Sequence, residues 1–582
     1  MITKKKKYTL YYVMALACGL VASFFIYSCS ADGYYSEEIE KNEVTNTRAL
    51  SSKMINNGST LIDSIASSDE FWEFEMSSEL LADKFHEYTS ILSEEEYEKL
   101  AVALQQEPPV SIRFNNEKWK MQDEGLSAVH SPFGRVPWSS EGVYLDERLT
   151  FTFDPLFHAG CFYVQEASSM FVEQALRQYI KEPAIMLDLC AAPGGKSTHA
   201  RSVLPEGSLL VANEVIRNRS QVLAENLAKW GHPDVVVTNN DPADFSALPS
   251  FFDVILTDVP CSGEGMFRKD PVAIEEWTPE NVEICWQRQR RIIADIWPCL
   301  KPGGILIYST CTFNTKEDEE NVRWIQQEFG AELLPLEVRE EWNITGNLLK
   351  DESAGTVHWE DIPVYHFFPH KTKGEGFFLA VLRKPCIETD ENETKKAWET
   401  INSQKSAISK STIARAAKKK GKHAGKGVPS VAKELMDVAR SWVRDIGNYS
   451  LLTDAETVYA FPNARLEELE ALRQKLKVIQ SGVSVGEVKG RDLVPAHALA
   501  LCPVLLRDGA FVVEDISYEQ AIAYLRKEAI VLPATVARGF VLLTYRGVPL
   551  GFVKNIGNRA NNLYPQEWRI RSGYLPEELR IL

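Results

Sequence analysis

The sequence predicts an α/β protein whose central domain is a doubly wound, mostly parallel sheet. Two observations lead to this fold class. From residue 185 onward, short apolar runs alternate with longer amphipathic segments, as they do in consecutive βα units. The first apolar run, residues 185–189, breaks at a small-residue turn, and a helix is expected to begin near Lys196. A hydrophobic strand that leads through a glycine-rich turn into a helix N-terminus is typical of a nucleotide-binding corner.

The expected elements of this domain follow one another in regular order. The predicted strands cover residues 185–190, 209–214, 235–239, 253–258 and 304–310. The predicted helices cover residues 196–203, 216–230, 283–299 and 316–329. Two further strands, residues 364–368 and 376–383, are expected to complete the domain. Because ligands of such sheets bind at the carboxyl ends of the strands, the site is expected there.

Length and composition favour several domains with reduced cysteines. A chain of 582 residues holds about three domains at roughly 150 residues each. The net charge of −17 is uneven, since residues 32–100 contain seventeen acidic and five basic residues. An acidic protein can still bind nucleic acid through a local basic patch. The ten cysteines include no Cys-x-x-Cys pair, so neither a zinc site nor a thioredoxin-like motif is expected. No metal-binding residues are predicted.

The corner at residues 186–196 differs from both common phosphate-binding motifs. A Walker A loop requires glycine where Cys190 stands, and no Gly-x-Gly-x-x-Gly is present here. A ligand held mainly through a pyrophosphate is therefore not expected. Glu214, Asp241 and Asp258 follow the second, third and fourth strands. A carboxylate after the second strand is typical of a ribose contact, and Asp241 is placed for the adenine side.

Two cysteines follow the fourth and fifth strands, so they are expected at one edge of the sheet beside the corner. Cys261 lies in Asp-Val-Pro-Cys-Ser-Gly and Cys311 in Ser-Thr-Cys-Thr-Phe. A thiolate can divide one difficult reaction into two easier covalent steps, and it needs a lowered pKa or a nearby base. The alternative, a buried small apolar side chain, is accepted for Cys190, Cys285 and Cys299.

Several segments resemble the Sun-type (NOL/NOP/Sun) RNA cytosine-C5 methyltransferases. Residues 190–196, Cys-Ala-Ala-Pro-Gly-Gly-Lys, are similar to their S-adenosylmethionine (SAM) loop. Residues 258–261 and 310–312 are similar to their two cysteine motifs. Residues 111–115, Ser-Ile-Arg-Phe-Asn, resemble the segment that opens their RNA-contacting N-terminal module, and residues 163–170 their pre-core segment. The resemblance implies a Rossmann-like, SAM-dependent methyltransferase core.

The resemblance also implies a role for each site residue. Cys311 is the nucleophile that adds to C6 of cytosine, Cys261 assists breakdown of the adduct, and Asp258 contacts the base. SAM is the implied cofactor, and the residues expected to bind it are Cys190, Ala191, Ala192, Pro193, Gly194, Gly195, Lys196, Glu214, Asp241 and Asp258. The related DNA enzymes attack from the Pro-Cys cysteine and use Glu-Asn-Val. Copies of this tripeptide at residues 280–282 and 320–322 are interpreted as surface helix residues.

Other polar side chains near these motifs are assigned supporting roles. Lys196 is expected to orient a phosphate or the aspartate that contacts the base. Asp188, inside the first strand, and His370 are expected to be structural. Arg268 and Lys269 belong to a Phe-Arg-Lys-Asp segment that also resembles the family. They either contact the RNA backbone or form part of a solvated loop.

The C-terminal part has features that suit RNA. Residues 400–433 contain nine Lys or Arg and no Asp or Glu, which indicates a flexible linker that can also bind phosphates. A separate mixed α/β region is expected after it, with a hairpin at residues 540–554. Polar and aromatic side chains over residues 557–570 suit stacked bases and phosphates. This end resembles the PUA-like domain of the RsmF group of bacterial small-subunit rRNA methyltransferases, and the family resemblance runs from about residue 94 to the C-terminus.

The N-terminus carries a signal that conflicts with such an enzyme. Lysines at residues 4–7 precede an apolar run over residues 8–28, and Cys29 ends a loose lipoprotein box. This pattern is typical of a secretory signal or a membrane anchor. Because an enzyme that uses SAM and RNA has no substrate outside the cytoplasm, residues 4–29 are interpreted as a fused reading frame or a misassigned start. The expected localisation is cytoplasmic, with a genuine anchor as the alternative.

These observations predict seven segments along the chain. They are a signal-like, lipoprotein-like or anchor segment (1–30), a polar acidic disordered segment (31–88), an N-terminal α/β RNA-contacting module (89–150), the methyltransferase core (151–385), the basic linker (386–430), a connecting domain (431–520) and the PUA-like RNA-binding domain (521–582). The implied function is formation of 5-methylcytosine in rRNA by a monomer that binds RNA and neither DNA nor metal. The alternatives are a tRNA substrate, a non-catalytic RNA-binding or assembly protein, and an envelope lipoprotein with a relic domain.

Overall fold

The computed structural model describes residues 92–119, 134–349, 362–386, 431–573 and 579–582. The predicted segments at residues 1–30 and 31–88 lie outside these ranges, as does all of the basic linker except residue 386. The chain divides into two compact units, residues 1–80 and 81–582. Every described residue belongs to the second unit. Within the described ranges, no helix is long and apolar enough to cross a membrane.

The N-terminal module contains one helix and a small antiparallel sheet. Helix α4 (Glu94–Leu104) is capped by Ser93, whose side chain accepts a hydrogen bond from the backbone N–H of Glu96. Strand β1 (Val110–Phe114) lies between β2 (Gly142–Leu145) and β3 (Phe162–Val164). Short helices α5 (Asn116–Trp119) and α6 (Pro155–His158) accompany this sheet. Because β3 pairs with β1, the sheet extends beyond residue 150, where the sequence analysis divided the module from the core.

The core is a nine-stranded sheet with the order β10-β11-β8-β7-β4-β5-β6-β14, and β9 (Glu332–Leu333) pairs with β11. Its parallel strands are β4 (Ile185–Asp188), β5 (Leu209–Asn213), β6 (Val235–Thr238), β7 (Phe252–Asp258) and β8 (Leu300–Thr310). At one edge β11 (Phe377–Arg383) runs antiparallel to β8, and β10 (Val364–Phe367) runs antiparallel to β11. At the other edge β14 (Val478–Ser481) runs antiparallel to β6. The predicted doubly wound, mostly parallel sheet is confirmed.

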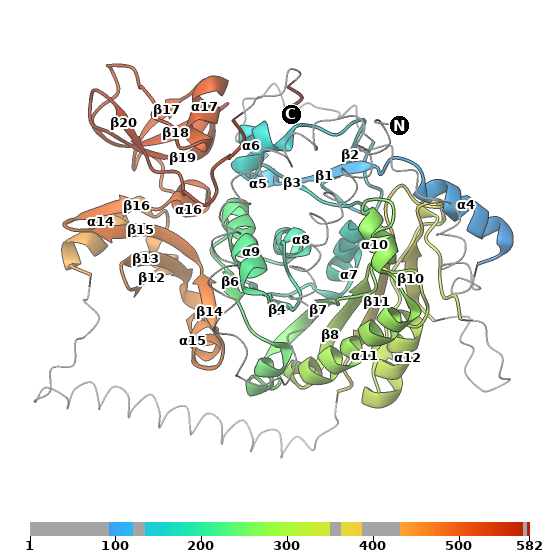
Figure 1. The fold of residues 1–582 in the computed structure, drawn as a ribbon. Helices are drawn as coiled ribbons and strands as arrows, with labels where there is room; N and C mark the ends of the chain where they lie inside the picture. The colour runs from blue at the N-terminus through green and yellow to red at the C-terminus, as the bar shows by residue number, and fades with distance from the viewer. Residues whose placement is uncertain (1–91, 120–133, 350–361, 387–430, 574–578) are drawn as a thin grey trace, which may run out of the picture. The chain divides into compact units, whose positions relative to one another are not determined.

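Helices cover both faces of this sheet (Figure 1). On one face lie α7 (Val172–Tyr179), α8 (Gly195–Val203) and α9 (Arg217–Trp230). On the other lie α11 (Pro279–Ile296) and α12 (Glu319–Phe329), and α10 (Pro271–Glu276) precedes them. Met186 packs into the first layer and its neighbour Leu187 into the second, because successive strand side chains point to opposite faces. This burial on both faces explains why the core strands are continuous apolar runs.

Two four-stranded sheets lie in the C-terminal region. The first has the order β12 (Tyr449–Asp454), β13 (Thr457–Pro462), β15 (Val483–Lys489) and β16 (Asp492–Pro495). The second has the order β17 (Val512–Asp515), β18 (Gly539–Tyr545), β19 (Val548–Asn555) and β20 (Ala560–Asn562). The helices of this region are α14 (Lys433–Trp442), α15 (Leu466–Lys475), α16 (His497–Ala500) and α17 (Tyr518–Leu525). The hairpin expected at residues 540–554 is confirmed as β18 and β19.

The region after residue 431 is joined to the core, which differs from the separate region that the sequence pattern suggested. Strand β14 completes the core sheet beside β6 (Figure 1). The backbone N–H of Asn239 donates to the carbonyl of Lys477 at 3.0 Å, and the N–H of Gly482 donates to the carbonyl of Val235 at 2.8 Å. Leu469 and Leu472 of α15 pack into the second helical layer. Periodicity could not reveal this pairing, because the two strands lie about 240 residues apart.

Candidate active site

The corner between β4 and α8 is built as the sequence predicted. Gly194 caps α8 with φ +115, a backbone conformation that only glycine adopts without strain. Side chains of α9 hold the loop carbonyls from outside: Arg219 donates to the carbonyl of Ala192 at 3.0 Å, and Asn226 to that of Pro193 at 2.8 Å. A side chain at Gly195 would meet the ring of Tyr163 at 3.3 Å. The turn is therefore a closely fitted backbone cradle at a helix N-terminus.

Asp188 lies buried beneath this cradle. Its Oδ2 accepts a hydrogen bond from Ser197 Oγ of α8 at 2.6 Å. Its Oδ1 has no hydrogen-bond partner among the described residues. Burial raises the pKa of Asp188 to about 7, and the nearby Asp258 charge acts in the same direction. The position, inside β4 and bonded to α8, matches the structural role expected for this residue.

Three carboxylates stand at the carboxyl ends of consecutive strands. The side chain of Glu214 is almost fully buried, accepts from the backbone N–H of Ile216 at 2.8 Å and lies 3.5 Å from Arg219. Asp241 follows β6, is exposed, and accepts from the N–H of Ala243 as the cap of η4 (Pro242–Ala247). Carboxylate acceptors next to a glycine cradle fit the ribose, adenine and amino groups of SAM.

Asp258 ends β7 and is held from two sides. Its Oδ2 accepts from Lys196 Nζ at 2.8 Å, and its Oδ1 accepts from Ser309 Oγ at 2.9 Å. Burial disfavours the ammonium form of Lys196, but the charge and hydrogen bond of Asp258 outweigh it and raise the pKa of Lys196. Of the two roles expected for Lys196, the geometry favours orientation of Asp258.

The two predicted cysteines meet at the same edge of the sheet. Cys261 Sγ and Cys311 Sγ lie 3.2 Å apart, and both side chains are half-buried. The hydrogen bond to Cys311 and burial together raise the pKa of Cys261 well above its usual value, so Cys261 stays a protonated thiol at neutral pH. By contrast, Cys285 and Cys299 are buried, as expected, and Cys190 is half-buried with a pKa raised by burial.

Comparison with known proteins assigns the chain to a family. Family models match three parts of the chain: "N-terminal domain of 16S rRNA methyltransferase RsmF" at residues 81–167, "16S rRNA methyltransferase RsmB/F" at 176–383 and "Methyltransferase RsmF PUA domain" at 511–570. The ribosomal RNA small subunit methyltransferase F of Klebsiella pneumoniae (strain 342) is 31% identical over 482 residues, which covers 80% of this chain and 91% of that protein. The chain belongs to the RsmF family of SAM-dependent rRNA small-subunit methyltransferases.

A second curated relative agrees with this RsmF assignment. The methyltransferase of the same description from Salmonella heidelberg (strain SL476) is 31% identical over 480 residues, with 80% of this chain and 91% of that protein covered. Among solved structures, a methyltransferase homolog protein from Pyrococcus horikoshii is 31% identical, with 52% of this chain and 94% of that chain covered and a TM-score of 0.44. The predicted resemblance to the Sun-type enzymes and to their RsmF group is confirmed.

The interpretation of the Glu-Asn-Val copies as surface residues is wrong for this RsmF-family chain. Asn321 and Val322 are buried, and Val282 in the other copy is buried too. The Asn321 amide donates to Gln289 Oε1 at 2.7 Å and to the hydroxyl of Tyr308 at 3.1 Å. Helices α11 and α12 both face the sheet, so the valine of each copy and Asn321 turn inward, whereas Glu280 is exposed.

Arg268 is also not where either sequence interpretation placed it. Its side chain is 5% exposed. It donates to Glu375 Oε2 at 3.0 Å and to the carbonyl of Gly374 at 2.7 Å. Arg268 therefore fixes the loop after Cys261 against residues 374–375 and is neither solvated nor free to bind a phosphate. Lys269 is exposed, 3.7 Å from Glu375, and an RNA contact through it stays a prediction.

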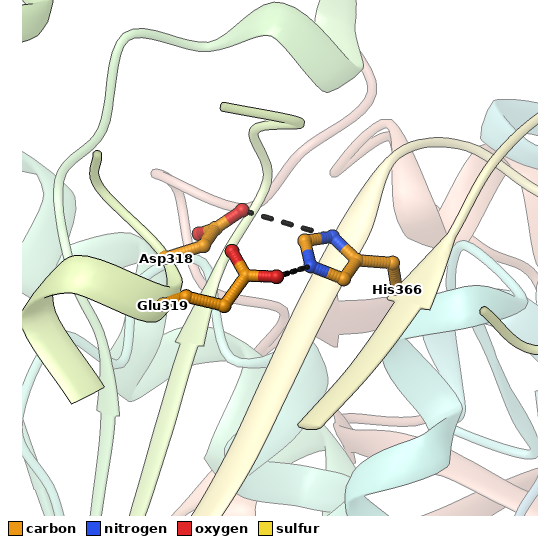
Figure 2. Close-up of side chains that lie close together, drawn as sticks. All are labelled: Asp318, Glu319 and His366. Carbon is orange, nitrogen blue, oxygen red and sulfur yellow. Dashed lines mark hydrogen bonds and ion pairs between the residues drawn. The ribbon is translucent and has the colours of Figure 1, made fainter. Parts of the chain in front are cut away.

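A group of buried ionisable side chains lies beside the end of β8 (Figure 2). It consists of Asp318, Glu319 and His366, whose candidate ligand atoms lie within 4.8 Å of one another. His366 Nε2 lies 2.8 Å from Glu319 Oε1, whereas its other nitrogen, Nδ1, lies 3.9 Å from Asp318 Oδ2. Because a different ring nitrogen faces each carboxylate, the geometry is that of an imidazole bridging two acids. Asp318 also accepts from Thr310 Oγ1 at 2.6 Å, directly before Cys311.

Sequence reasoning missed the buried polar side chains between the two cysteine loops. Glu264, Asn314 and Glu317 are each at most 2% exposed and are hydrogen-bonded to one another's loops. Each lies within six residues of a cysteine motif. A polar residue this close to a reactive thiol is the one sequence signal that could have marked them.

Proposed function

We propose that this RsmF-family chain forms 5-methylcytosine in small-subunit rRNA through a covalent adduct between Cys311 and the base. The observation that carries the proposal is the pair of thiols 3.2 Å apart at the sheet edge. This edge also holds the Lys196–Asp258 pair and the cradle at the start of α8. A nucleophile, a charged group for the base and a cofactor loop thus converge on one place.

The cradle and the strand-end carboxylates fit SAM. When bound, SAM supplies a methyl group on a positively charged sulfur. The loop 190–196 would hold it through backbone groups, as the glycine conformation of Gly194 permits. The Glu214 carboxylate would accept from the ribose hydroxyls, and Asp241 would lie on the adenine side. Asp188 would support the cradle from below through Ser197.

The two cysteines are assigned the different roles that the family resemblance implies. The Cys311 thiolate adds to C6 of cytosine, and the new S–C bond places an electron pair on the ring that makes C5 nucleophilic. Asp258, held by Lys196 and Ser309, faces the base and stabilises a proton at N3 or N4 as the ring becomes electron-rich. Once C5 carries the methyl group that SAM would supply, its proton passes to solvent water. The S–C bond then breaks, its electron pair returns to Cys311 Sγ, and the C5–C6 double bond forms again. Cys261, kept as a thiol, assists this breakdown.

The relatives point to the substrate and the compartment. Both curated relatives are described as ribosomal RNA small subunit methyltransferases. The PUA-domain match at residues 511–570 supports RNA as the partner. We propose that a monomer acts on rRNA in the cytoplasm. A tRNA substrate would use the same chemistry, and the assay below includes it as a competitor.

Adduct trapping tests this proposal. Cys261→Ala and Cys311→Ala variants are incubated with SAM and small-subunit rRNA, and a denaturing gel separates free from protein-linked RNA. Cys261→Ala is expected to accumulate a covalent adduct, and Cys311→Ala to form none. Cys285→Ala, at a buried cysteine of α11, is the matched control and is expected to behave as the wild type. An adduct that requires Cys261 would reverse the roles, and a wild-type protein that forms no 5-methylcytosine in rRNA would overturn the proposal.

A further inference from the structure

We propose that Glu264 and Glu317 are positioning residues that form a reciprocal clamp between the two cysteine loops and thereby set the distance between the reactive thiols. This inference rests on the proposed function, since it assigns to both carboxylates an effect on adduct chemistry at Cys311. Neither carboxylate touches the reacting atoms. Each is carried by one cysteine loop and binds the other.

Glu264 follows Cys261 by three residues and holds the Cys311 loop. Its Oε2 accepts from the Thr312 hydroxyl at 2.5 Å and from the backbone N–H groups of Phe313 and Asn314 at 2.7 and 3.0 Å. Its Oε1 accepts from the Asn314 amide at 2.9 Å and from the indole of Trp277 at 3.0 Å. The side chain is 0% exposed, so all five donors replace water.

Glu317 follows Cys311 by six residues and holds the Cys261 loop. Both of its oxygens receive the backbone N–H of Ser262, at 3.1 and 3.3 Å. Gln289 of α11 donates to Glu317 Oε2 at 2.7 Å and to the carbonyl of Pro260 at 3.0 Å with the same amide nitrogen. The residues on either side of Cys261 are thus fixed by one carboxylate and one amide from beneath.

The two halves of the clamp are joined to each other. The Asn314 amide donates to Glu264 Oε1 at 2.9 Å and to Glu317 Oε1 at 2.9 Å. In addition, the backbone N–H of Gly265 donates to the carbonyl of Cys311 at 2.7 Å. Burial, followed by the charge of Glu264, raises the pKa of Glu317 to about 7. Two acids this close in a dry interior persist only because each is surrounded by donors.

The clamp makes a specific prediction for amide variants. In the wild type, Oε1 of Glu264 accepts two hydrogen bonds and Oε2 accepts three. In Glu264→Gln an NH₂ group replaces one of these oxygens. Whichever oxygen it replaces, the NH₂ group then faces at least two N–H or O–H donors and cannot accept from them. The loops must then separate. Since a displacement of about 1 Å at reacting groups costs about 100-fold in rate, we expect kcat to fall by about 100-fold while KM for SAM and for rRNA stays unchanged.

The matched control is Asp234→Asn. Asp234 forms a mostly buried ion pair with Arg201 at 3.1 Å. It directly precedes β6 and so lies at the amino ends of the parallel strands, whereas the two cysteines lie at the carboxyl ends. It is expected to lose stability and to keep the wild-type kcat at a temperature where it is folded. Glu317→Gln is expected to lower kcat as Glu264→Gln does, since both oxygens of Glu317 face N–H donors.

A second readout needs no turnover. Diamide takes up the two thiol hydrogen atoms as a disulfide forms, and at 3.2 Å Cys261 and Cys311 are placed to react. Peptide mass spectrometry of the full chain then gives the rate of this disulfide, which is expected to fall at least about 10-fold in Glu264→Gln relative to Asp234→Asn. If Glu264→Gln matches Asp234→Asn in both kcat and disulfide rate, the clamp is refuted. If the wild type forms no 5-methylcytosine but the disulfide rates differ as expected, the proposed function fails and the clamp geometry stands.

Discussion

Asp188 gives a pH dependence of stability that follows from its burial beneath the cofactor loop. Its folded pKa is about 7, against an ordinary value of 3.8. The folded state therefore binds the proton more tightly than the unfolded state does. The resulting contribution to stability is complete below pH 3.8 and is lost as the pH rises toward 7. Replacement by asparagine removes this titration and keeps an oxygen that accepts from Ser197.

The size of the effect follows from the slope between the two pKa values. One proton contributes about 1.4 kcal/mol per pH unit, and the slope halves near pH 7. The free energy of unfolding of Asp188→Asn, relative to that of the wild type, should therefore rise by about 2 kcal/mol between pH 5 and 7. Above about pH 8 the difference should be constant. If burial of the asparagine amide destabilises the variant, the free energy of unfolding of Asp188→Asn changes by the same amount at every pH. Its dependence on pH is then unaffected.

Urea unfolding at pH 5, 6, 7 and 8, followed by tryptophan fluorescence, measures this difference directly. The free energy of unfolding of the wild type is subtracted from that of the variant at each pH. This removes the contributions of buried histidines such as His199, whose pKa burial lowers to about 4 and which make stability rise with pH. Ser197→Ala removes the donor that favours the charged form of Asp188. The folded pKa of Asp188, seen as the upper bend in the plot of unfolding free energy against pH, should therefore be higher in this variant than in the wild type. Parallel stability curves for Asp188→Asn and wild type across this pH range would refute the reasoning.

Two further substitutions test packing that the sequence did not reveal. Arg268→Ala leaves Glu375 buried without its guanidinium partner and should lower the free energy of unfolding in urea by about 3–5 kcal/mol. The salt dependence of RNA binding should stay unchanged in this variant. If Arg268→Ala, rather than Lys269→Ala, reduces the slope of log Kd against log salt, Arg268 is an RNA contact. Gly231→Ala places a Cβ 2.0 Å from the carbonyl oxygen of Leu501 at φ +86, and calorimetry should show a loss of more than about 2 kcal/mol. Gly490→Ala, with φ +66 and no atom within 4 Å, isolates the backbone cost of about 1–2 kcal/mol, and equal losses in both glycine variants would contradict the close approach at Gly231.

The elements of the core could be predicted because its strands and helices carry strong local signals. Strands buried on both faces are short unbroken apolar runs, and the glycines of the corner mark a backbone turn. The meeting of Cys261 and Cys311 was also predictable, because the carboxyl ends of neighbouring parallel strands share one edge. In this case the order of the strands in the sequence is enough to predict which loops lie next to each other.

The remaining features depend on contacts that carry no local signal. Arg268 and Asn321 look like surface residues by type, and only the partners that surround them show that they are buried. Strand β14 is a four-residue segment whose partner β6 lies about 240 residues earlier. The buried acids Glu264 and Glu317 are compatible with the interior only through donors from other loops, which composition does not reveal.

The position of β14 has a consequence for synthesis of the chain. Until residue 481 has left the ribosome, the outer edge of β6 cannot receive its last partner, although the other strands of the core have already been made. An open edge on an apolar sheet is a surface on which nascent chains pair wrongly with one another. Truncation anywhere between residues 384 and 477 would therefore produce a catalytic core with an uncapped edge. The segment that leads to the PUA domain therefore also protects the edge of the core sheet.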